Sequence, residues 1–369
     1  MKKYLLLATT AMVAMGFTGC AGGSEKTHGD LTKLTDYLYE VTYTDLNDSL
    51  IAELSDSAHA FIKVEGACSS VRNGNFYGRN LDLFYNDGCE VVVHMEKSEN
   101  RLASVAVCGG KADITAEVLE KADEKLMQRL PFIVLDGINE CGVTCNVNVV
   151  PGEDTAPITG TNPGKENLAC SMALRYILDR AKTAKEAVEL LENRNLLGSF
   201  GHLGLHYMIA DAKETYIVEF VDNKMQYVVS EPVCDTNVMT NLYSTLLPKY
   251  TPHANGIERY AILQENYNEG NSVDGMAKLM QRVKYTQTYD PNTNPFWYSE
   301  YYGGAITIDT PKEKVMESAK PFFEICKAHK RNTNFWQTVH TSVYDLQNLT
   351  LRLYVQENYE KAFDFKLEK

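Results

Sequence analysis

CSSVRNGNFYGRNLD, residues 68–82, contains the clearest structural signal in this chain. Short apolar or alternating runs lie on either side of residues 72–75, and an Asn-Gly pair between such runs is a strong signal for a tight β-hairpin turn. We therefore expect Cys68 to begin one strand and Arg79 to lie on the strand that returns beside it. The thiol and the guanidinium would then be neighbours in space.

Cys68 is also placed to become a new N-terminus. If the bond between Ala67 and Cys68 were cut, one residue would carry a thiol nucleophile and a free α-amine to act as its base, an arrangement that hydrolyses amides. Arg79 beside the thiol would lower its pKa, and the Asp82 carboxylate would hold the new ammonium group. We expect the chain to make this cut itself, by attack of the Cys68 thiol on the preceding carbonyl.

The composition is that of an ordinary globular protein. The chain has 369 residues, 44% of them hydrophobic and 23% charged, so it can bury a sizeable core in one large domain or two modest ones. Its formal net charge is -13, and no run of basic residues occurs. Because nucleic-acid binding depends on Lys and Arg that neutralise phosphates, we expect no nucleic-acid partner.

Residues 1–20 are predicted to be an export signal peptide. Lys2 and Lys3 give a basic start, residues 4–17 are largely apolar, and a small-residue region ends at Cys20. The apolar run is shorter than the ~20 helical residues that span a bilayer. The region before Cys20 resembles a bacterial lipoprotein box, in which the cysteine carries the lipid. We therefore expect an exported protein that is held at the bacterial cell envelope, with lipid on Cys20 as its only attachment to the membrane. The alternative is an ordinary secretory signal without a lipid.

The nine cysteines show no disulfide or metal pattern. No two of them form a CxxC pair, and none has a Cys/His spacing suited to zinc. Cys141 and Cys145 lie too far apart along an extended chain to bridge each other. We expect no disulfide framework, no metal and no cofactor.

Residues 21–67 are predicted to be a flexible tether followed by a pro-segment. Leu31, Leu34, Leu38 and Val41 recur at mostly helical spacing, which predicts one or two amphipathic helices. We place the mature domain at residues 68–369. Periodicity alone leaves two possibilities open for the segment before it: removal on maturation, or retention as an integral N-terminal part of the mature domain.

From residue 60 onward, groups of strands alternate with groups of helices. The order lacks strict βαβ alternation, which favours an α+β fold of layered antiparallel sheets covered by helices over a doubly wound parallel sheet. A Tyr-rich stretch at 285–302 has no clear period and is predicted to be a loop. Strands are predicted at 60–64, 76–78, 90–93, 102–107, 205–210, 215–221, 224–229, 304–308, 338–344 and 349–355, and helices at 113–129, 168–181, 183–193 (capped by Thr183), 256–268 and 273–284.

Four blocks, in order along the chain, carry a resemblance to a known family. They are residues 74–82 (GNFYGRNLD), residues 136–143 (DGINECGV), a third block running from 206–211 (HYMIAD) through 217–219 (IVE) to 239–241 (MTN), and residues 256–260 (GIERY). In these blocks the chain resembles the choloylglycine hydrolase family of linear amide C–N hydrolases, which contains the bile salt hydrolases and penicillin V acylases. The resemblance implies an N-terminal-nucleophile hydrolase with an αββα sandwich and a catalytic cysteine, here Cys68.

The resemblance also implies roles for further residues. Arg79 and Asp82 would be the catalytic arginine and aspartate, and Arg259 the second arginine near the nucleophile. Asn241 would supply a side-chain amide to the oxyanion, together with a backbone N–H at Asn148 or Val149, where this chain departs from the family's asparagine.

Each assignment has a plainer alternative. Arg79 and Asp82 could form a hairpin ion pair, and Asn241 could be a turn residue. Asp136 and Asn139 are expected to organise a turn and are left out of the catalytic set.

Three functional classes follow for the whole chain. The first is an amidase that removes an acyl group from an amino acid or small amine, acting on conjugated bile salts, N-acyl amino acids, lipid amides or penicillin V. The second is an acyltransferase of the same architecture, and the third a catalytically silent lipoprotein that binds an acylated ligand. The resemblance also implies a homo-oligomer, although no self-complementary surface is evident in the sequence.

Overall fold

The computed structural model describes residues 27–51, 68–84, 88–110, 114–151, 162–197, 203–221, 224–229, 233–234, 259, 262–284, 287–288 and 334–367. Cys20, Ala67 and Asn241 lie outside the described residues, as do the predicted signal peptide, the predicted strands at 60–64 and 304–308, and most of the stretch 285–302. The predicted helix at 256–268 lies only partly within them.

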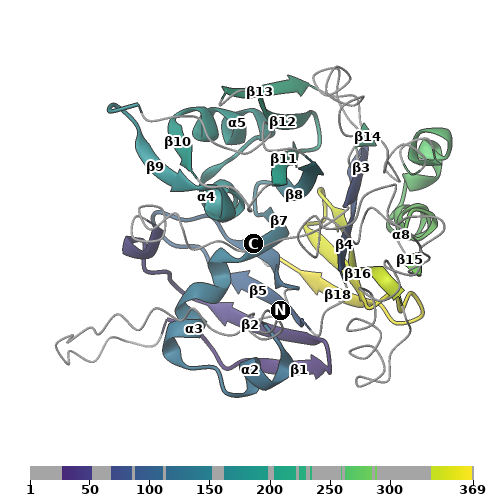
Figure 1. The fold of residues 1–369 in the computed structure, drawn as a ribbon, viewed down its shortest axis with the longest axis horizontal. Coiled ribbons are helices and arrows are strands. Elements are labelled where there is room, and N and C mark those ends of the chain that lie inside the picture. Colours follow the sequence, from purple (N-terminus) through teal and green to yellow (C-terminus); the bar gives the residue numbers. More distant parts are fainter. Residues whose placement is uncertain are drawn as a thin grey trace, which may run out of the picture.

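A nine-stranded sheet forms one half of the fold (Figure 1). Its neighbouring strands are antiparallel except for β2 and β5, which are parallel. In spatial order the strands are β1 (Thr32–Thr35), β2 (Leu38–Tyr43), β5 (Glu90–Met95), β6 (Ser104–Gly109), β7 (Val134–Asn139), β8 (Thr144–Pro151), β11 (Leu203–Ala210), β12 (Thr215–Val221) and β13 (Lys224–Val229).

A seven-stranded antiparallel sheet forms the other half, and the predicted hairpin lies within it. Ser70 pairs with Arg79 across β3 and β4, and Gly74 in the turn has a φ of 58°, a backbone conformation that glycine adopts without strain. In spatial order the strands are β14 (Val233–Cys234), β3 (Ser69–Asn73), β4 (Phe76–Phe84), β16 (Asn334–Asp345), β17 (Thr350–Val355) and β18 (Phe363–Lys366), with β15 (Gln287–Thr288) paired to β16.

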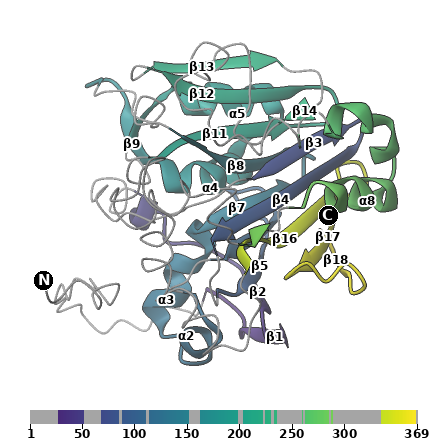
Figure 2. The ribbon, with the colours of Figure 1, turned by 45° about the vertical axis from the view of Figure 1, so that its right-hand side comes forward.

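The two sheets pack face to face because their strands are apolar on both sides. In β5, Val92 joins a core shared with Leu351 and Leu353 of the other sheet, while Val91 and Val93 point to the opposite face. That opposite face is covered by α4 (Ala173–Arg180) and α5 (Ala184–Glu192), and α8 (Val273–Arg282) covers the outer face of the seven-stranded sheet (Figure 2). The predicted α+β fold with an αββα arrangement is confirmed.

Smaller elements fill the edges of this sandwich. They are α2 (Ala116–Glu120), α3 (Glu124–Arg129), the 3₁₀ turns Leu130–Phe132, Cys170–Met172 and Tyr267–Gly270, and a parallel pair of strands, β9 (Glu166–Ala169) and β10 (Arg194–Leu197).

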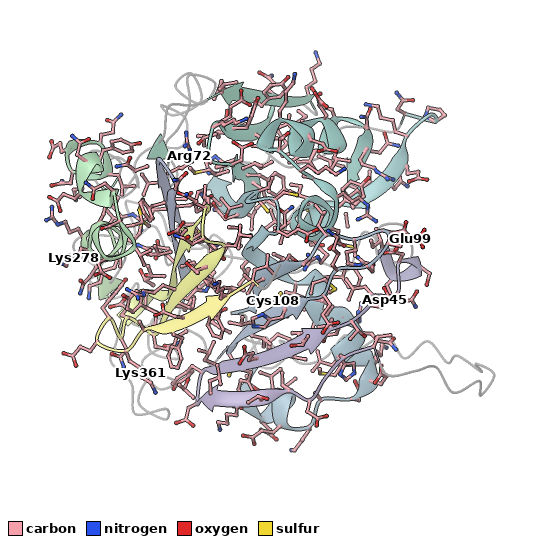
Figure 3. The ribbon with its side chains drawn as sticks, turned by 180° about the vertical axis from the view of Figure 1, so that it is seen from behind. Asp45, Arg72, Glu99, Cys108, Lys278 and Lys361 are labelled. Carbon is pink, nitrogen blue, oxygen red and sulfur yellow. The ribbon has the colours of Figure 1, made fainter. Side chains whose placement is uncertain are left out.

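Charged side chains such as Lys278 and Lys361 are exposed at the periphery of the sandwich, whereas Cys108 is buried (Figure 3).

Two helix predictions needed correction and one cap is confirmed. The single helix expected at 113–129 is two helices, because Asp123 accepts a hydrogen bond from the Leu126 amide and so begins a new helix, α3. The helix expected from residue 168 begins at Ala173, after β9. Thr183 caps α5 as predicted, accepting from the Glu186 amide.

In the described residues before Cys68, 32–35 and 38–43 are strands β1 and β2 and not helices, whereas residues 49–51 are helical. Leu38 is buried between the sheets, and Tyr39, Val41 and Tyr43 are buried on the helix-covered face. The leucine spacing suited a helix, but the aromatic and β-branched residues of β2 gain more from pairing with β5. The Tyr43 hydroxyl also donates to the Met127 carbonyl at 2.6 Å. The described part of this segment is thus an integral part of the sheet.

A pair of alanine substitutions distinguishes a strand from a helix in this segment. On a helix, Leu34 and Leu38 would share one face, and replacing either with alanine would lower the free energy of unfolding by a similar amount. In the sheet Leu38 is fully buried and Leu34 only partly, so we expect Leu38→Ala to lower the free energy of unfolding by about 2–5 kcal/mol, and Leu34→Ala by clearly less. Urea unfolding of both variants measures this, and equal losses would contradict the strand assignment.

Candidate active site

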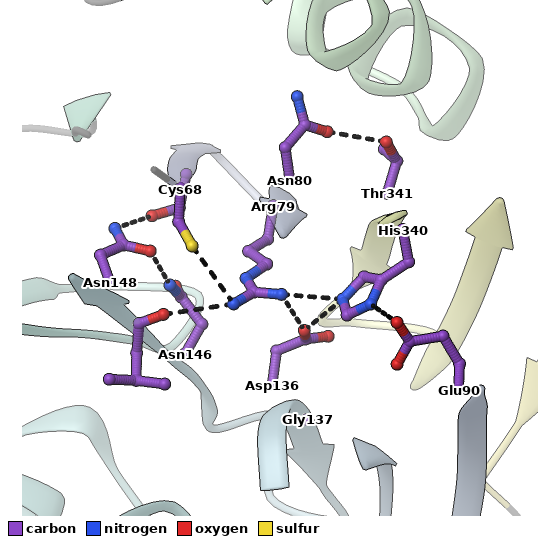
Figure 4. Close-up of polar contacts among 12 residues, drawn as sticks. Cys68, Arg79, Asn80, Glu90, Asp136, Gly137, Asn146, Asn148, His340 and Thr341 are labelled. Atoms are coloured by element: carbon purple, nitrogen blue, oxygen red, sulfur yellow. Dashed lines mark hydrogen bonds and ion pairs between the residues drawn. The ribbon is translucent and has the colours of Figure 1, made fainter. Parts of the chain in front are cut away.

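The hairpin formed by β3 and β4 brings Cys68 and Arg79 together. Cys68 directly precedes β3, Arg79 lies on β4, and the Arg79 Nη2 atom is 3.8 Å from the Cys68 sulfur (Figure 4). Cys68 is only 1% exposed and packs among apolar side chains that include Leu81 and Val339. The predicted proximity of the thiol and the guanidinium is therefore present in the fold.

Burial is the largest influence on the pKa of the Cys68 thiol. It raises the pKa of the thiol, and the Arg79 charge together with a hydrogen bond from the Asp82 backbone opposes this only in part. In the uncleaved chain the thiol therefore keeps its proton.

Arg79 is itself completely buried and is held by groups from the opposite sheet. Its Nη1 lies 3.0 Å from Asp136 Oδ2 on β7, and its Nη2 donates to the Val147 carbonyl of β8 at 3.2 Å. These contacts leave the Nη2 end of the guanidinium at the sulfur and the Nη1 end at the carboxylate.

The Asp136 carboxylate accepts hydrogen bonds from more than Arg79. His340 Nε2 on β16 lies 2.8 Å from its Oδ2, and the Tyr344 hydroxyl donates to its Oδ1. Burial alone would raise the pKa of Asp136, but His340 and Arg79 outweigh it and hold the pKa at about 2. Asp136 is thus an ionised partner of Arg79. The expectation that Asp136 only organises a turn was wrong, whereas the Asn139 side chain does so by accepting from the amides of Cys141 and Val143.

A second buried ion pair lies on the same strand as Arg79. The Asp82 carboxylate accepts from Arg259 Nη1 at 2.5 Å and from the Thr338 hydroxyl at 2.6 Å. Burial raises the pKa of Asp82 and these partners oppose it only in part. Arg259 Nη1 also donates to the Val283 carbonyl at 3.2 Å. Asp82 and Arg259, which are far apart in sequence, are therefore direct partners beside Cys68.

The predicted oxyanion residues are only partly described. Asn148 lies on β8, fully buried, and its side-chain amide donates to Ser70 Oγ at 3.1 Å while accepting from Asn146 at 2.7 Å. Val149 is the next residue of the same strand. Asn241 lies outside the described residues. The structure thus places β8 beside the hairpin of β3 and β4.

Sequence reasoning missed His340, Glu90 and Thr338, because each stands alone in a strand with no motif around it. Among the described residues, no group of three or more His, Cys, Asp or Glu side chains is arranged to hold a metal ion. Six of the described cysteines are free thiols: Cys68, Cys89, Cys108, Cys141, Cys145 and Cys170. None of the helices in this part of the chain is long and apolar enough to cross a membrane.

Comparison with known proteins agrees with the block pattern. Residues 68–358 match the sequence model of the linear amide C–N hydrolases of the choloylglycine hydrolase family. No protein with a curated description matches the chain.

Solved structures of bacterial amide hydrolases are similar over most of their length. Two variants of the conjugated bile acid hydrolase from Clostridium perfringens show 14% and 12% identity, each with a TM-score of 0.44, covering 81% of this chain and 92% of theirs. The penicillin V acylase from Agrobacterium tumefaciens shows 16% identity and a TM-score of 0.37, covering 81% and 86%. These similarities are too low to carry any of those substrates over to this chain.

The Asp82–Arg259 pair can be tested by its contribution to stability. Removing one member leaves the other as a buried charge without its partner, so we expect Asp82→Asn and Arg259→Gln each to cost about 3–5 kcal/mol of unfolding free energy. The double variant leaves neither charge and is expected to cost clearly less than the sum of the two. Urea unfolding of the three variants measures this coupling, and strictly additive losses would show that the pair does not form.

Proposed function

This chain belongs to the choloylglycine hydrolase family of linear amide C–N hydrolases, and we propose that it hydrolyses an amide with the Cys68 thiol after the Ala67–Cys68 bond has been cut. The observation that carries this proposal is the buried Arg79 guanidinium, 3.8 Å from the Cys68 sulfur. The family match also begins at residue 68 itself. A thiolate with a fixed cationic neighbour is the activated form of a cysteine nucleophile.

In the proposed mechanism, the cut supplies the missing base. The new α-amine, with an ordinary pKa of about 7.7–8.0, takes the thiol proton, and the Arg79 charge stabilises the thiolate. The Asp82 carboxylate orients the resulting ammonium group, and Arg259 holds Asp82 in place. The raised pKa of the Cys68 thiol in the uncleaved chain supports this order of events, because the precursor has a protonated nucleophile.

The chemical steps then follow those of a thiol amidase. The thiolate attacks the amide carbonyl, and the oxyanion is stabilised by the Asn241 side chain and a backbone N–H at Asn148 or Val149. The C–N bond breaks, the amine leaves with a proton from the α-ammonium, and an acyl-thioester remains on Cys68. Water, deprotonated by the α-amine, attacks the thioester and releases the acid and the thiol.

The substrate we propose is a small molecule in which an acyl group is joined to an amino acid or small amine. The candidates are conjugated bile salts, N-acyl amino acids, lipid amides and penicillin V. The family supports small-molecule amides as a class. We further propose that the protein is exported and anchored to the cell envelope by lipid on Cys20.

A hydrolysis panel tests the reaction and its substrate class. Purified protein is incubated with taurine- and glycine-conjugated bile salts, N-acyl amino acids, a fatty-acid amide and penicillin V, and the released amine or acid is quantified by mass spectrometry. We expect hydrolysis of at least one class by the wild type and none by Cys68→Ala. Transfer of the acyl group to an added amine in preference to water would instead identify an acyltransferase.

Processing is tested by intact mass and N-terminal sequencing. We expect a wild-type chain that begins at Cys68 and a Cys68→Ala variant that stays uncut, because the thiol is the attacking group. We also expect the fragment containing residues 27–51 to co-elute with the larger chain on gel filtration and to separate from it only in denaturant, since β2 is buried in the sheet. Normal cleavage of Cys68→Ala would exclude autocatalysis.

A further inference from the structure

A row of buried charges of alternating sign joins the nucleophile hairpin to the nine-stranded sheet. Its members are Arg79 on β4, Asp136 on β7, His340 on β16 and Glu90 on β5 (Figure 4). We propose that His340 is a positioning residue: as an imidazolium between Asp136 and Glu90, it keeps the Arg79 guanidinium fixed at the Cys68 sulfur. The inference rests on the proposed function, in which Arg79 stabilises the thiolate.

Both ring nitrogens of His340 face a carboxylate. Nδ1 lies 3.0 Å from Glu90 Oε1, and Nε2 lies 2.8 Å from Asp136 Oδ2. A neutral imidazole has a single N–H, so one carboxylate would face a lone pair, whereas an imidazolium donates to both. Arg79 Nη1 lies 2.8 Å from His340 Nε2 and 3.0 Å from the same Asp136 oxygen. A neutral ring could accept from Arg79 at Nε2 but would turn that lone pair toward Asp136, whereas an imidazolium directs its Nε2–H to Asp136, as Arg79 does.

Charge balance favours the same protonation state. Arg79, Asp136 and His340 are fully buried and Glu90 is 2% exposed. With a protonated His340 the two cations offset the two carboxylates, whereas a neutral ring would leave one uncompensated negative charge in the core. Burial acts to lower the pKa of His340, but Glu90 and Asp136 outweigh it and the pKa is raised. The remaining polar group at this cluster, the Tyr344 hydroxyl, donates to Asp136 and is neutral.

The far end of the row is anchored by backbone. The Glu90 amide donates to the Tyr37 carbonyl at 2.9 Å, next to the pairing of β2 with β5. Beside the carboxylate lies Gly110, with a φ of 64°, where an added Cβ would come within 2.8 Å of Glu90 Oε1. The Glu90 carboxylate thus lies against the backbone at Gly110 on one side and 3.0 Å from His340 Nδ1 on the other.

Loss of the His340 charge has a defined electrostatic consequence. His340→Gln leaves Arg79 with two carboxylates, so the row carries a net negative charge close to the Cys68 sulfur. That charge disfavours the thiolate and raises the pKa of the thiol. Adding Glu90→Gln removes the excess charge and leaves Arg79 paired with Asp136 alone.

The test measures thiol reactivity directly. Alkylation of Cys68 by iodoacetamide is followed against pH by peptide mass spectrometry, alongside kcat and KM for any amide that the wild type hydrolyses. We expect His340→Gln to lower the alkylation rate at pH 7 by about tenfold, equivalent to ~1 pKa unit, and to lower kcat more than it raises KM. The double variant His340→Gln/Glu90→Gln is expected to recover most of the alkylation rate.

A matched control is present on β5, the strand that carries Glu90. His94 on β5 pairs with Glu40 at 2.8 Å but is half-buried and absent from the row, so His94→Gln should leave the alkylation profile unchanged. A folded His340→Gln variant with the wild-type profile, or a double variant no more reactive than the single one, would overturn the proposal. Alkylation requires no amide substrate, so a chain that hydrolyses nothing on the panel would refute the proposed function and leave this test intact.

A second measurement does not depend on His340→Gln folding. In ¹³C-histidine NMR spectra of the wild type, we expect one ring to remain an imidazolium at pH 7.5 and to lose its proton at lower pH in Glu90→Gln. A wild-type spectrum in which every histidine is neutral at pH 7.5 would overturn the proposal.

Discussion

Burial of the Arg79 guanidinium is the constraint on which the rest of this structure depends. A cation with no exposed surface is costly unless it is paired and hydrogen-bonded, and Arg79 meets its partners across the space between the two sheets. The arginine belongs to the seven-stranded sheet, and Asp136 and the Val147 carbonyl belong to the nine-stranded one. A shift of either sheet would separate these groups, so the ion pair sets the register in which the two halves of the sandwich meet.

The same constraint explains why the site is divided between distant parts of the chain. Cys68 and Arg79 come from one hairpin, but the groups that hold the Arg79 guanidinium come from strands β7, β8 and β16. Asp82 is similarly held by Arg259 and Thr338. Positions that differ widely in sequence number therefore behave as one electrostatic unit, in which removing one charge changes the state of its neighbours.

The parts of the fold that could be predicted from sequence are those set by local signals. The Asn73-Gly74 turn brought Cys68 beside Arg79, and the Thr183 cap began α5 where expected. The order of strands and helices favoured layered antiparallel sheets covered by helices, and the family resemblance implied the αββα sandwich. Arg79, Asp82 and Arg259 were singled out because they lie in recognisable blocks, and the structure brings Arg259 to the hairpin that carries the other two.

What could not be predicted depends on contacts between distant residues. His340 and Glu90 have no motif, and their significance arises only when β16 and β5 meet across the sheet interface. The spacing of the leucines in residues 31–41 suited a helix. Residues 38–43 form a strand because they pair in parallel with β5, which is distant in sequence. Asp136 was assigned to a turn because its partner, Arg79, is 57 positions away in the numbering (136 minus 79).

If the protein is anchored to the cell envelope as proposed, the position of β2 has a consequence for that attachment. With lipid on Cys20 and a cut after Ala67, the lipid and the nucleophile would belong to different polypeptides. The catalytic chain would then have no covalent link to the bilayer. Its attachment would consist of the backbone hydrogen bonds between β2 and β5 and the burial of Leu38, Tyr39, Val41 and Tyr43, so the strand that completes the sheet would also be the membrane tether.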